Sequence, residues 1–207
     1  AEIKGLLDPK GLMNPGKIVN PPKMDEVRLF RFPPGYATQP PPAALDWSEW
    51  GGFDKAVEMC NNNGHCRKRD AGTMCPSYRA TGDERHLTRG RANTLRLALS
   101  GQLGAQSDEA VKAALDLCVS CKGCKRECPT GVDMARMKIE FLAHYKARHG
   151  HTLRDRVVAD LPRYAPWAAR LAPLANLLQP LGARLAGFTT RRALPRWRRD
   201  RFVDRAW

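Results

Sequence analysis

Apolar residues between positions 45 and 150 recur every three to four residues, which is the spacing of one face of an α-helix. The pattern predicts four helices in this region, over residues 52–59, 90–100, 108–117 and 133–148. Thr88 and Ser107 stand where the N-caps of the second and third helices belong, and Gly101 stops the second helix. We therefore expect a mainly α fold.

The apolar faces of these helices predict the core of the domain. Apolar residues share a face within each of the three longer helices: Ala92, Leu95 and Leu99; Val111, Ala114 and Leu115; Met134, Met137, Phe141 and Tyr145. A stripe of methionines and aromatics at helical spacing is most simply core packing, not a cofactor pocket. The third helix ends directly before Cys118, so its end is expected to position this cysteine as a ligand.

The segment that precedes this domain differs from it in composition. Residues 1–20 are rich in turn-forming residues, and because the chain does not start with methionine we expect it to be a piece of a longer protein. The prolines of residues 21–44 forbid helix and favour an extended linker or strap. Trp47 and Trp50 follow the strap and are expected to anchor it onto the domain.

Residues 151–207 form a predicted helical, basic extension after the domain. Prolines interrupt its helical turns, and residues 171–185 are apolar enough to form an amphipathic helix. These apolar faces would suit docking to another domain or subunit, and peripheral contact with a membrane surface is the alternative. No stretch approaches eighteen uninterrupted apolar residues, so no transmembrane helix is expected.

The chain carries a formal net charge of +14 over 207 residues, with a sequence pI of about 9.9. Much of this charge comes from arginines towards the C-terminus: Arg184, Arg191, Arg192, Arg196, Arg198, Arg199, Arg201 and Arg205. Nucleic acid, an anionic membrane face or an acidic partner domain could bind such a tail, whereas a solvated surface or docking within the parent protein is the simpler interpretation. No basic motif is interleaved with aromatics, so no nucleic-acid partner is expected.

The spacing of four cysteines is the most specific signal in the sequence. Cys118, Cys121, Cys124 and Cys128, followed by Pro129, form the C-x2-C-x2-C-x3-C-P pattern of an iron–sulfur cluster. Three thiolates at this spacing reach three corners of one cubane, while the cysteine before the proline points to a neighbouring cluster. The pattern therefore predicts a second group of cysteines.

That second group lies upstream and is one cysteine short. Cys60, Cys66 and Cys75 repeat the same order, and Cys75 again precedes a proline. If the ligands cross over as in two-cluster ferredoxins, Cys75 completes a 4Fe-4S site. That site comprises Cys75, Cys118, Cys121 and Cys124, and the remaining ligands are Cys60, Cys66 and Cys128.

The missing ligand can be located, because Asn63 stands three residues after Cys60 and three before Cys66, where the middle cysteine would be. A site with three thiolates could hold a 3Fe-4S cluster, or a 4Fe-4S cluster whose fourth iron takes water, His65, Asp54 or Asn63. It could also be empty. The occupancy of this second site stays open at the level of the sequence.

Disulfides and zinc are the other interpretations of these cysteines. Disulfides are not expected, because the count is odd, the spacing is close and no signal peptide indicates an oxidising compartment. Pairs of Cys-x2-Cys also bind zinc, which a second pair or histidines usually complete. A third cysteine followed by Cys-Pro is more than a single zinc ion needs, so we favour iron and sulfide.

Charged residues near the cysteines have a predicted role in tuning. A thiolate-ligated cluster is anionic, so the cations Lys122, Lys125 and Arg126 should raise its reduction potential. His144 and His149 lie at an exposed helix end, where a basic side chain suits the helix dipole, and they are not expected to be ligands.

Two acidic residues between the two cysteine groups are expected to have structural roles. Asp83 and Glu84 are expected to bind loop amides or to pair with Arg89 and Arg91. No catalytic residues are expected, because the chain shows no nucleophile with a base and no phosphate-binding glycine loop after a strand.

Residues 60–150 resemble the helical ferredoxin segment of large fused FAD-linked dehydrogenases. The resemblance is carried by Cys60-Asn-Asn-Asn-Gly-His-Cys66, Gly72-Thr-Met-Cys75-Pro, Thr88-Arg-Gly-Arg-Ala-Asn93 and the run from Cys118 to Asp133. That family joins a vanillyl-alcohol-oxidase-type flavin domain to a module similar to the glycolate oxidase iron-sulfur subunit. The opening run, Leu7-Asp8-Pro9-Lys10-Gly11 to Asn14-Pro15-Gly16-Lys17, resembles the closing residues of such a flavin domain.

The resemblance implies an alpha-helical ferredoxin and a D-2-hydroxyacid dehydrogenase of the D-lactate, glycolate or D-2-hydroxyglutarate type. In that family FAD takes a hydride from the substrate, and electrons then pass singly through iron–sulfur centres to an acceptor, either a quinone or a carrier protein. Most of the flavin domain and the cysteine-rich domain that usually follows are missing here. We therefore expect an electron conduit in the cytoplasm, or peripheral to the inner membrane face, and the rival hypothesis is a basic zinc-binding nucleic-acid or scaffold module.

Overall fold

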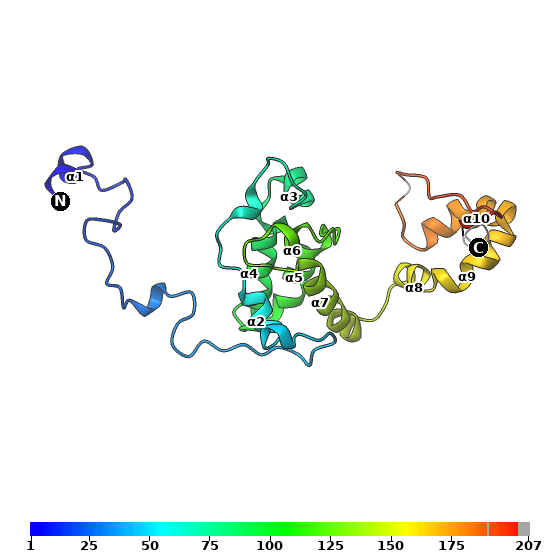
Figure 1. The fold of residues 1–207 in the computed structure, drawn as a ribbon, viewed down its shortest axis with the longest axis horizontal. Coiled ribbons are helices and arrows are strands. Elements are labelled where there is room, and N and C mark those ends of the chain that lie inside the picture. The colour runs from blue at the N-terminus through cyan, green and yellow to red at the C-terminus, as the bar shows by residue number, and fades with distance from the viewer. Residues whose placement is uncertain (190, 203–207) are drawn as a thin grey trace. The chain divides into compact units, whose positions relative to one another are not determined.

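The computed structural model describes residues 1–189 and 191–202, and every regular element in these ranges is a helix (Figure 1). The α-helices are α1 (Glu2–Leu7), α2 (Phe53–Glu58), α3 (Pro76–Thr81), α4 (Thr88–Leu99), α5 (Ser107–Asp116), α6 (Gly123–Glu127), α7 (Met134–His149), α8 (Leu153–Ala159), α9 (Leu161–Arg170) and α10 (Ala172–Leu185). Short 3-10 turns are η1 (Val27–Leu29), η2 (Ser48–Trp50), η3 (His65–Arg67), η4 (Glu84–His86) and η5 (Gly104–Gln106). The predicted mainly α fold is confirmed.

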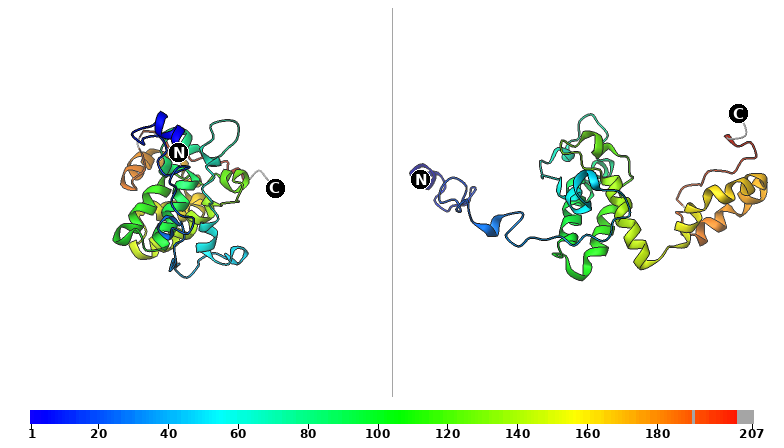
Figure 2. Two further views of the ribbon diagram at one scale, coloured as in Figure 1. Left: turned by 90° about the vertical axis from the view of Figure 1, so that its left-hand side faces the viewer. Right: turned by 60° about the horizontal axis from the view of Figure 1, so that its bottom comes forward.

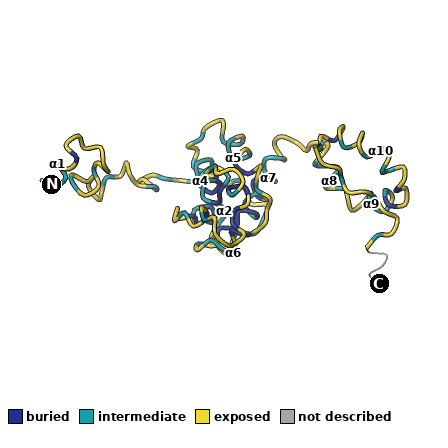
Figure 3. Tube along the Cα trace, turned by 90° about the horizontal axis from the view of Figure 1, so that it is seen from above, coloured by how far each residue is buried: buried dark blue, intermediate teal, exposed yellow. Residues whose placement is uncertain are grey.

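The chain divides into two compact units, residues 1–134 and residues 135–207. In the first unit, α4 packs against both α2 and α5, and the buried residues gather around these helices (Figure 3). Ala92 and Leu95 of α4 and Val111 and Leu115 of α5 are all at most 2% exposed, so they belong to this core. Burying one leucine side chain stabilises the fold by about 1.5–3 kcal/mol.

The two predicted N-caps are wrong, although the helices lie where the pattern placed them. Thr88 is the first residue of α4, and Leu87 takes the N-cap position in an extended conformation because its side chain is fully buried in the core. Ser107 begins α5 directly after η5, with the helical angles φ −57° and ψ −44°. A cap needs a non-helical backbone, so a chain that is already helical leaves Ser107 no place to act as one.

The proline-rich strap lies along α4 from Arg31 onwards. The Arg31 guanidinium donates to the carbonyl oxygen of Cys60 at 2.6 Å and to Asn93 Oδ1 at 3.3 Å. Further along, the Gln39 amide donates to the carbonyl oxygen of Leu99, the last residue of α4. Trp47 is 3% exposed, with its ring 5.2 Å from that of Phe53, so it packs into the domain as expected of an anchor.

The second unit holds α8, α9 and α10 as one helical group (Figure 2). A capping box starts α8, because the Thr152 hydroxyl accepts from the Asp155 amide and the Asp155 carboxylate accepts from the Thr152 amide. The segment after α10 folds back along it, since the Asn176 side chain bonds both the amide and the carbonyl of Trp197.

Leucines on α10 are largely exposed, and an apolar cavity of about 700 Å³ lies among α8, α9, α10 and the returning segment. The predicted amphipathic helix over 171–185 corresponds to α10. Of the arginines predicted to form a basic tail, Arg205 lies outside the described residues. None of the described helices is both long and apolar enough to cross a membrane.

Candidate metal centre

Two segments that are far apart in the sequence, and that each adjoin a predicted ligand, are in contact. A Cβ on Gly123, the first residue of α6, would lie 2.8 Å from Thr73 Oγ1 and 3.2 Å from the Met74 amide nitrogen. Because glycine has no Cβ, the two segments approach each other this closely without a clash. Because Cys75 follows Met74 and Cys124 follows Gly123, the neighbours of two predicted ligands are in direct contact.

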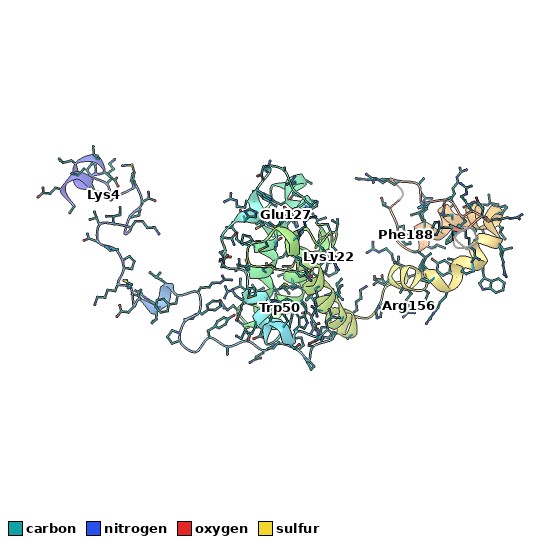
Figure 4. All side chains as sticks on the ribbon, in the orientation of Figure 1. Lys4, Trp50, Lys122, Glu127, Arg156 and Phe188 are labelled. Atoms are coloured by element: carbon teal, nitrogen blue, oxygen red, sulfur yellow. The ribbon has the colours of Figure 1, made fainter. Side chains whose placement is uncertain are left out.

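A carboxylate holds the same two segments together. Glu127 Oε1 accepts from the Thr73 amide at 2.5 Å and from the Thr73 hydroxyl at 2.6 Å. Lys68 adds an ion pair of 3.0 Å to Oε2. These bonds, with those from Thr73 first, lower the pKa of Glu127 to about 2. Figure 4 labels Glu127, the last residue of α6, and Lys122, which directly precedes this helix; Trp50, also labelled, belongs to η2, which contacts α2.

The loop of the Cys118–Cys128 motif is tightly wound, as the spacing predicts. Its backbone holds Ser120 at φ 54° and Lys122 at φ 58°, the left-handed region that non-glycine residues seldom adopt. The Cys118 amide bonds the Leu115 carbonyl at the end of α5, so this helix does present the first cysteine of the motif. Cys121 is exposed and Cys124 is buried.

Cys124 is surrounded by groups that suit a metal-bound thiolate. Burial raises the pKa of the Cys124 thiol, and the amides of Met134 and Lys125, which donate to its sulfur, oppose that rise. Cys118 is close enough to add a further upward contribution to this pKa. The first and third cysteines of the motif therefore share one environment.

Cys75 lies in a buried polar pocket. Its sulfur is 3.3 Å from the His86 carbonyl oxygen and accepts from Arg91 Nη1 at 3.3 Å. Arg91 is 1% exposed and also donates from Nε to the Ala114 carbonyl at 2.8 Å. The expectation that Arg91 pairs with Asp83 or Glu84 is therefore wrong.

The sequence contained a signal for the position of Arg91. It lies four residues before Leu95 on the inward face of α4, where an arginine needs a buried acceptor. Glu84 instead pairs with Arg89 at 2.6 Å and with Arg67 at 3.0 Å, and Asp83 accepts from the Arg85 amide.

The second group of cysteines is only partly assembled. Cys60 and Cys66 are both buried and close enough that Cys60 adds to the upward shift of the Cys66 pKa, for which burial is the main cause. The Arg89 amide donates to the Cys66 sulfur and opposes this shift of pKa. Cys128 is half-buried, and its sulfur lies 3.3 Å from Thr130 Oγ1. Its membership of this group stays a prediction.

The candidates for a fourth ligand of the second group are engaged elsewhere or exposed. Asn63 Oδ1 accepts from the His65 amide at 2.8 Å, and Asn63 Nδ2 donates to Asn61 at 2.6 Å. Asp54 Oδ2 accepts from the Thr38 hydroxyl at 2.7 Å. Asn63 therefore shapes the turn between the two cysteines.

Within the part of the chain that the structure describes, no three His, Cys, Asp or Glu side chains surround a point that would hold a single metal ion. The hydrogen-bond donors at the cysteine sulfurs are compatible with iron–sulfur cluster ligation. Cys66, Cys75 and Cys124 each accept at least one N–H bond, and such bonds stabilise cluster thiolates.

The remaining residues that the sequence singled out lie at the surface or in local pairs. Lys122, Lys125 and Arg126 are exposed, and Lys125 lies 3.7 Å from the Asp133 carboxylate. His144 Nε2 lies 2.8 Å from Glu140 Oε1, and the His149 ring stacks 4.2 Å from that of Tyr145.

Comparison with known proteins agrees with the chemistry of the cysteines. Residues 56–132 match the family described as the 4Fe-4S dicluster domain. The chain is 29% identical to D-2-hydroxyglutarate dehydrogenase of Escherichia coli (strain K12) over 196 residues, which cover 70% of this chain and 19% of that protein. It is 32% identical over 85 residues to the probable glycolate oxidase iron-sulfur subunit of Bacillus subtilis (strain 168), covering 41% of this chain and 19% of the subunit.

A further relative is D-2-hydroxyglutarate dehydrogenase of Pseudomonas putida, 29% identical over 166 residues that cover 64% of this chain and 16% of that protein. The chain thus spans less than a fifth of the length of each of these relatives. No solved structure matches the chain. The predicted resemblance to an iron–sulfur module of hydroxyacid dehydrogenases is confirmed.

Proposed function

We propose that this chain is the iron–sulfur electron-transfer segment of an FAD-linked D-2-hydroxyacid dehydrogenase. The observation that supports the proposal is the close approach of α6 to the segment that precedes Cys75, where residues next to a predicted ligand in each motif are in contact. The match of residues 56–132 to a 4Fe-4S dicluster domain supports the same chemistry.

The first cluster would be held by ligands from both motifs: Cys75, Cys118, Cys121 and Cys124. Cys60, Cys66 and Cys128 would hold a second cluster of the 3Fe-4S or 4Fe-4S type. When bound, such a cluster accepts and releases one electron at a time. The protein contributes the hydrogen bonds, burial and charge that fix the sulfurs and set the direction of transfer.

The substrate class and partners follow from the relatives. Those compared are D-2-hydroxyglutarate dehydrogenases and a probable glycolate oxidase subunit, so we infer a parent enzyme that oxidises a small D-2-hydroxyacid. FAD would be bound by a separate flavin domain, and residues 1–20 would be the end of that domain. A quinone or a carrier protein would take the electrons, in the cytoplasm or at the inner face of the membrane.

Reconstitution with iron and sulfide under anaerobic conditions tests the first half of the proposal. Brown protein with a paramagnetic resonance signal is expected, with about four irons per chain for one cluster and about seven or eight for two. A colourless protein that takes up zinc instead would overturn the proposal and favour the zinc module.

Electron transfer from flavin tests the second half. The reconstituted chain is mixed with a flavin domain reduced by its hydroxyacid, and bleaching of the cluster is followed by stopped flow. Bleaching at least as fast as steady-state turnover is expected. Much slower bleaching would contradict a conduit and indicate a cluster with a purely structural role.

A further inference from the structure

Arg91 is a cation enclosed within the first unit. It extends from α4, is 1% exposed, and uses three of its donors at once. Nε donates to the Ala114 carbonyl at 2.8 Å, Nη1 to Cys75 Sγ at 3.3 Å and Nη2 to Ser77 Oγ at 2.8 Å. The planar guanidinium is thus fixed in one orientation with a predicted cluster ligand in front of it.

Among the residues that the structure describes, no carboxylate contacts Arg91. An arginine keeps its charge in any protein environment, and a buried cation without a counter-anion is strongly destabilising. Of its three acceptors, the Ala114 carbonyl and the Ser77 hydroxyl are neutral. The sulfur of Cys75 is the acceptor that can carry a negative charge, as it does when it binds iron.

The position of Arg91 connects both halves of the predicted ligand set. Through Ala114 it binds the helix that ends before Cys118, and through Cys75 it binds the other motif. Its helix is held in turn by Gly90, where any Cβ would collide with the carbonyl oxygen of Glu84. A shift of the α4 backbone at Arg91 would therefore disturb the packing of η4 against α4.

We infer that Arg91 is a positioning residue that raises the reduction potential of the cluster bound by Cys75. This inference rests on the proposed function. Reduction adds negative charge to the cluster, and a buried N–H donor with a positive charge stabilises that charge more than it stabilises the oxidised form. Lys122, Lys125 and Arg126 are exposed to water and salt, which screen their effect.

The test is a potentiometric titration of the reconstituted full chain, followed by paramagnetic resonance. Arg91→Gln removes the charge, and Arg96→Gln is the matched control. Arg96 lies on the same helix, and its guanidinium is over the rings of Phe32 and Tyr36. A Cys75→Ser variant shows which resonance signal belongs to the cluster in question.

For Arg91→Gln we expect at least a tenfold fall in the equilibrium constant for one-electron reduction, which is a potential about 59 mV lower. Arg91→Lys keeps the charge but loses the planar fork, so a fall of about threefold is expected. Arg96→Gln should change the constant less than twofold.

The outcomes separate the two claims. If the wild-type chain takes up no cluster, the proposed function fails and the inference falls with it. If the cluster forms and Arg91→Gln titrates at the wild-type potential, the function stands and the inference is overturned. Should Arg91→Gln take up no iron, Arg91→Lys decides, and a wild-type potential in that variant also overturns the inference.

Discussion

Gly123 controls how closely α6 approaches the loop before Cys75, and Gly123→Ala tests whether this approach builds the site. The added Cβ would lie 2.8 Å from Thr73 Oγ1 and 3.2 Å from the backbone at Thr73 and Met74. To make room, the Thr73 hydroxyl must move away from Glu127, to which it donates at 2.6 Å. We expect a less stable fold and a weaker hold on iron.

The magnitude follows from two opposing effects. Overpacking a closely packed contact costs about 1–3 kcal/mol, while alanine in a helix is favoured over glycine by about 0.5–1 kcal/mol. The net result is a destabilisation of about 1 kcal/mol, which lowers the melting temperature of a unit of this size by about 4 °C. Because Gly123 adjoins a predicted ligand, the iron content after reconstitution should fall as well.

The assay is thermal unfolding of the full chain, read together with iron content after anaerobic reconstitution. Gly182→Ala is the control, because Gly182 lies in α10 with no atom within 4 Å of an added Cβ. That variant should be as stable as the wild type or slightly more stable, with unchanged iron. If Gly123→Ala melts at or above the wild-type temperature and binds the same iron, the contact does not build the site.

Three further predictions concern charge, capping and ligand assignment. The pKa of Glu127 is lowered from 4.5 to about 2, so its contribution to stability is complete above pH 4.5 and is lost as the pH falls towards 2. The difference in free energy of unfolding between the wild-type apo-protein and Glu127→Gln, measured with urea, should therefore become smaller over that pH range. A difference that does not change with pH would contradict the reasoning. Thr152→Ala removes the cap of α8 and should cost about 1 kcal/mol in urea unfolding, whereas the exposed neighbour His151→Ala should cost nothing measurable. Cys75→Ala should remove about four irons per chain, but Cys60→Ala should leave the first cluster intact, and equal losses would refute the crossed pairing of ligands.

The sequence predicted the longer helices of the domain well because their signal is local, but it did not predict the short helices α1, α3 and α6. The apolar periodicity over 108–117 corresponds to α5, and Val111, Ala114 and Leu115 are buried as predicted. The N-caps were mispredicted because the start of α4 is set by the burial of Leu87 and the start of α5 by the turn before Ser107. Neither feature can be read from Thr88 or Ser107.

In the candidate site, too, the features that depend on local sequence were predicted and those that depend on tertiary packing were not. Cysteine spacing predicted the candidate ligands, and the motifs around the cysteines indicated the likeness to an iron–sulfur module that the comparisons confirm. Spacing did not reveal that Glu127 links the two motifs, because its carboxylate accepts a hydrogen bond from Thr73, which lies 54 residues earlier in the sequence. Arg91 was misassigned to nearby acids for the same reason, since its acceptor is fixed by the packing of α4 against α5.

The left-handed backbone at Ser120 and Lys122 has a consequence for how the protein matures. An unfolded chain seldom visits this shape, because side chains other than glycine disfavour it. Under the proposed function, the energy of iron–thiolate bonds would help to hold the loop in this shape, so metal uptake would order the loop at the same time. The first iron to bind would then hold the remaining sulfurs in place for the others, and partly loaded forms would be scarce during assembly.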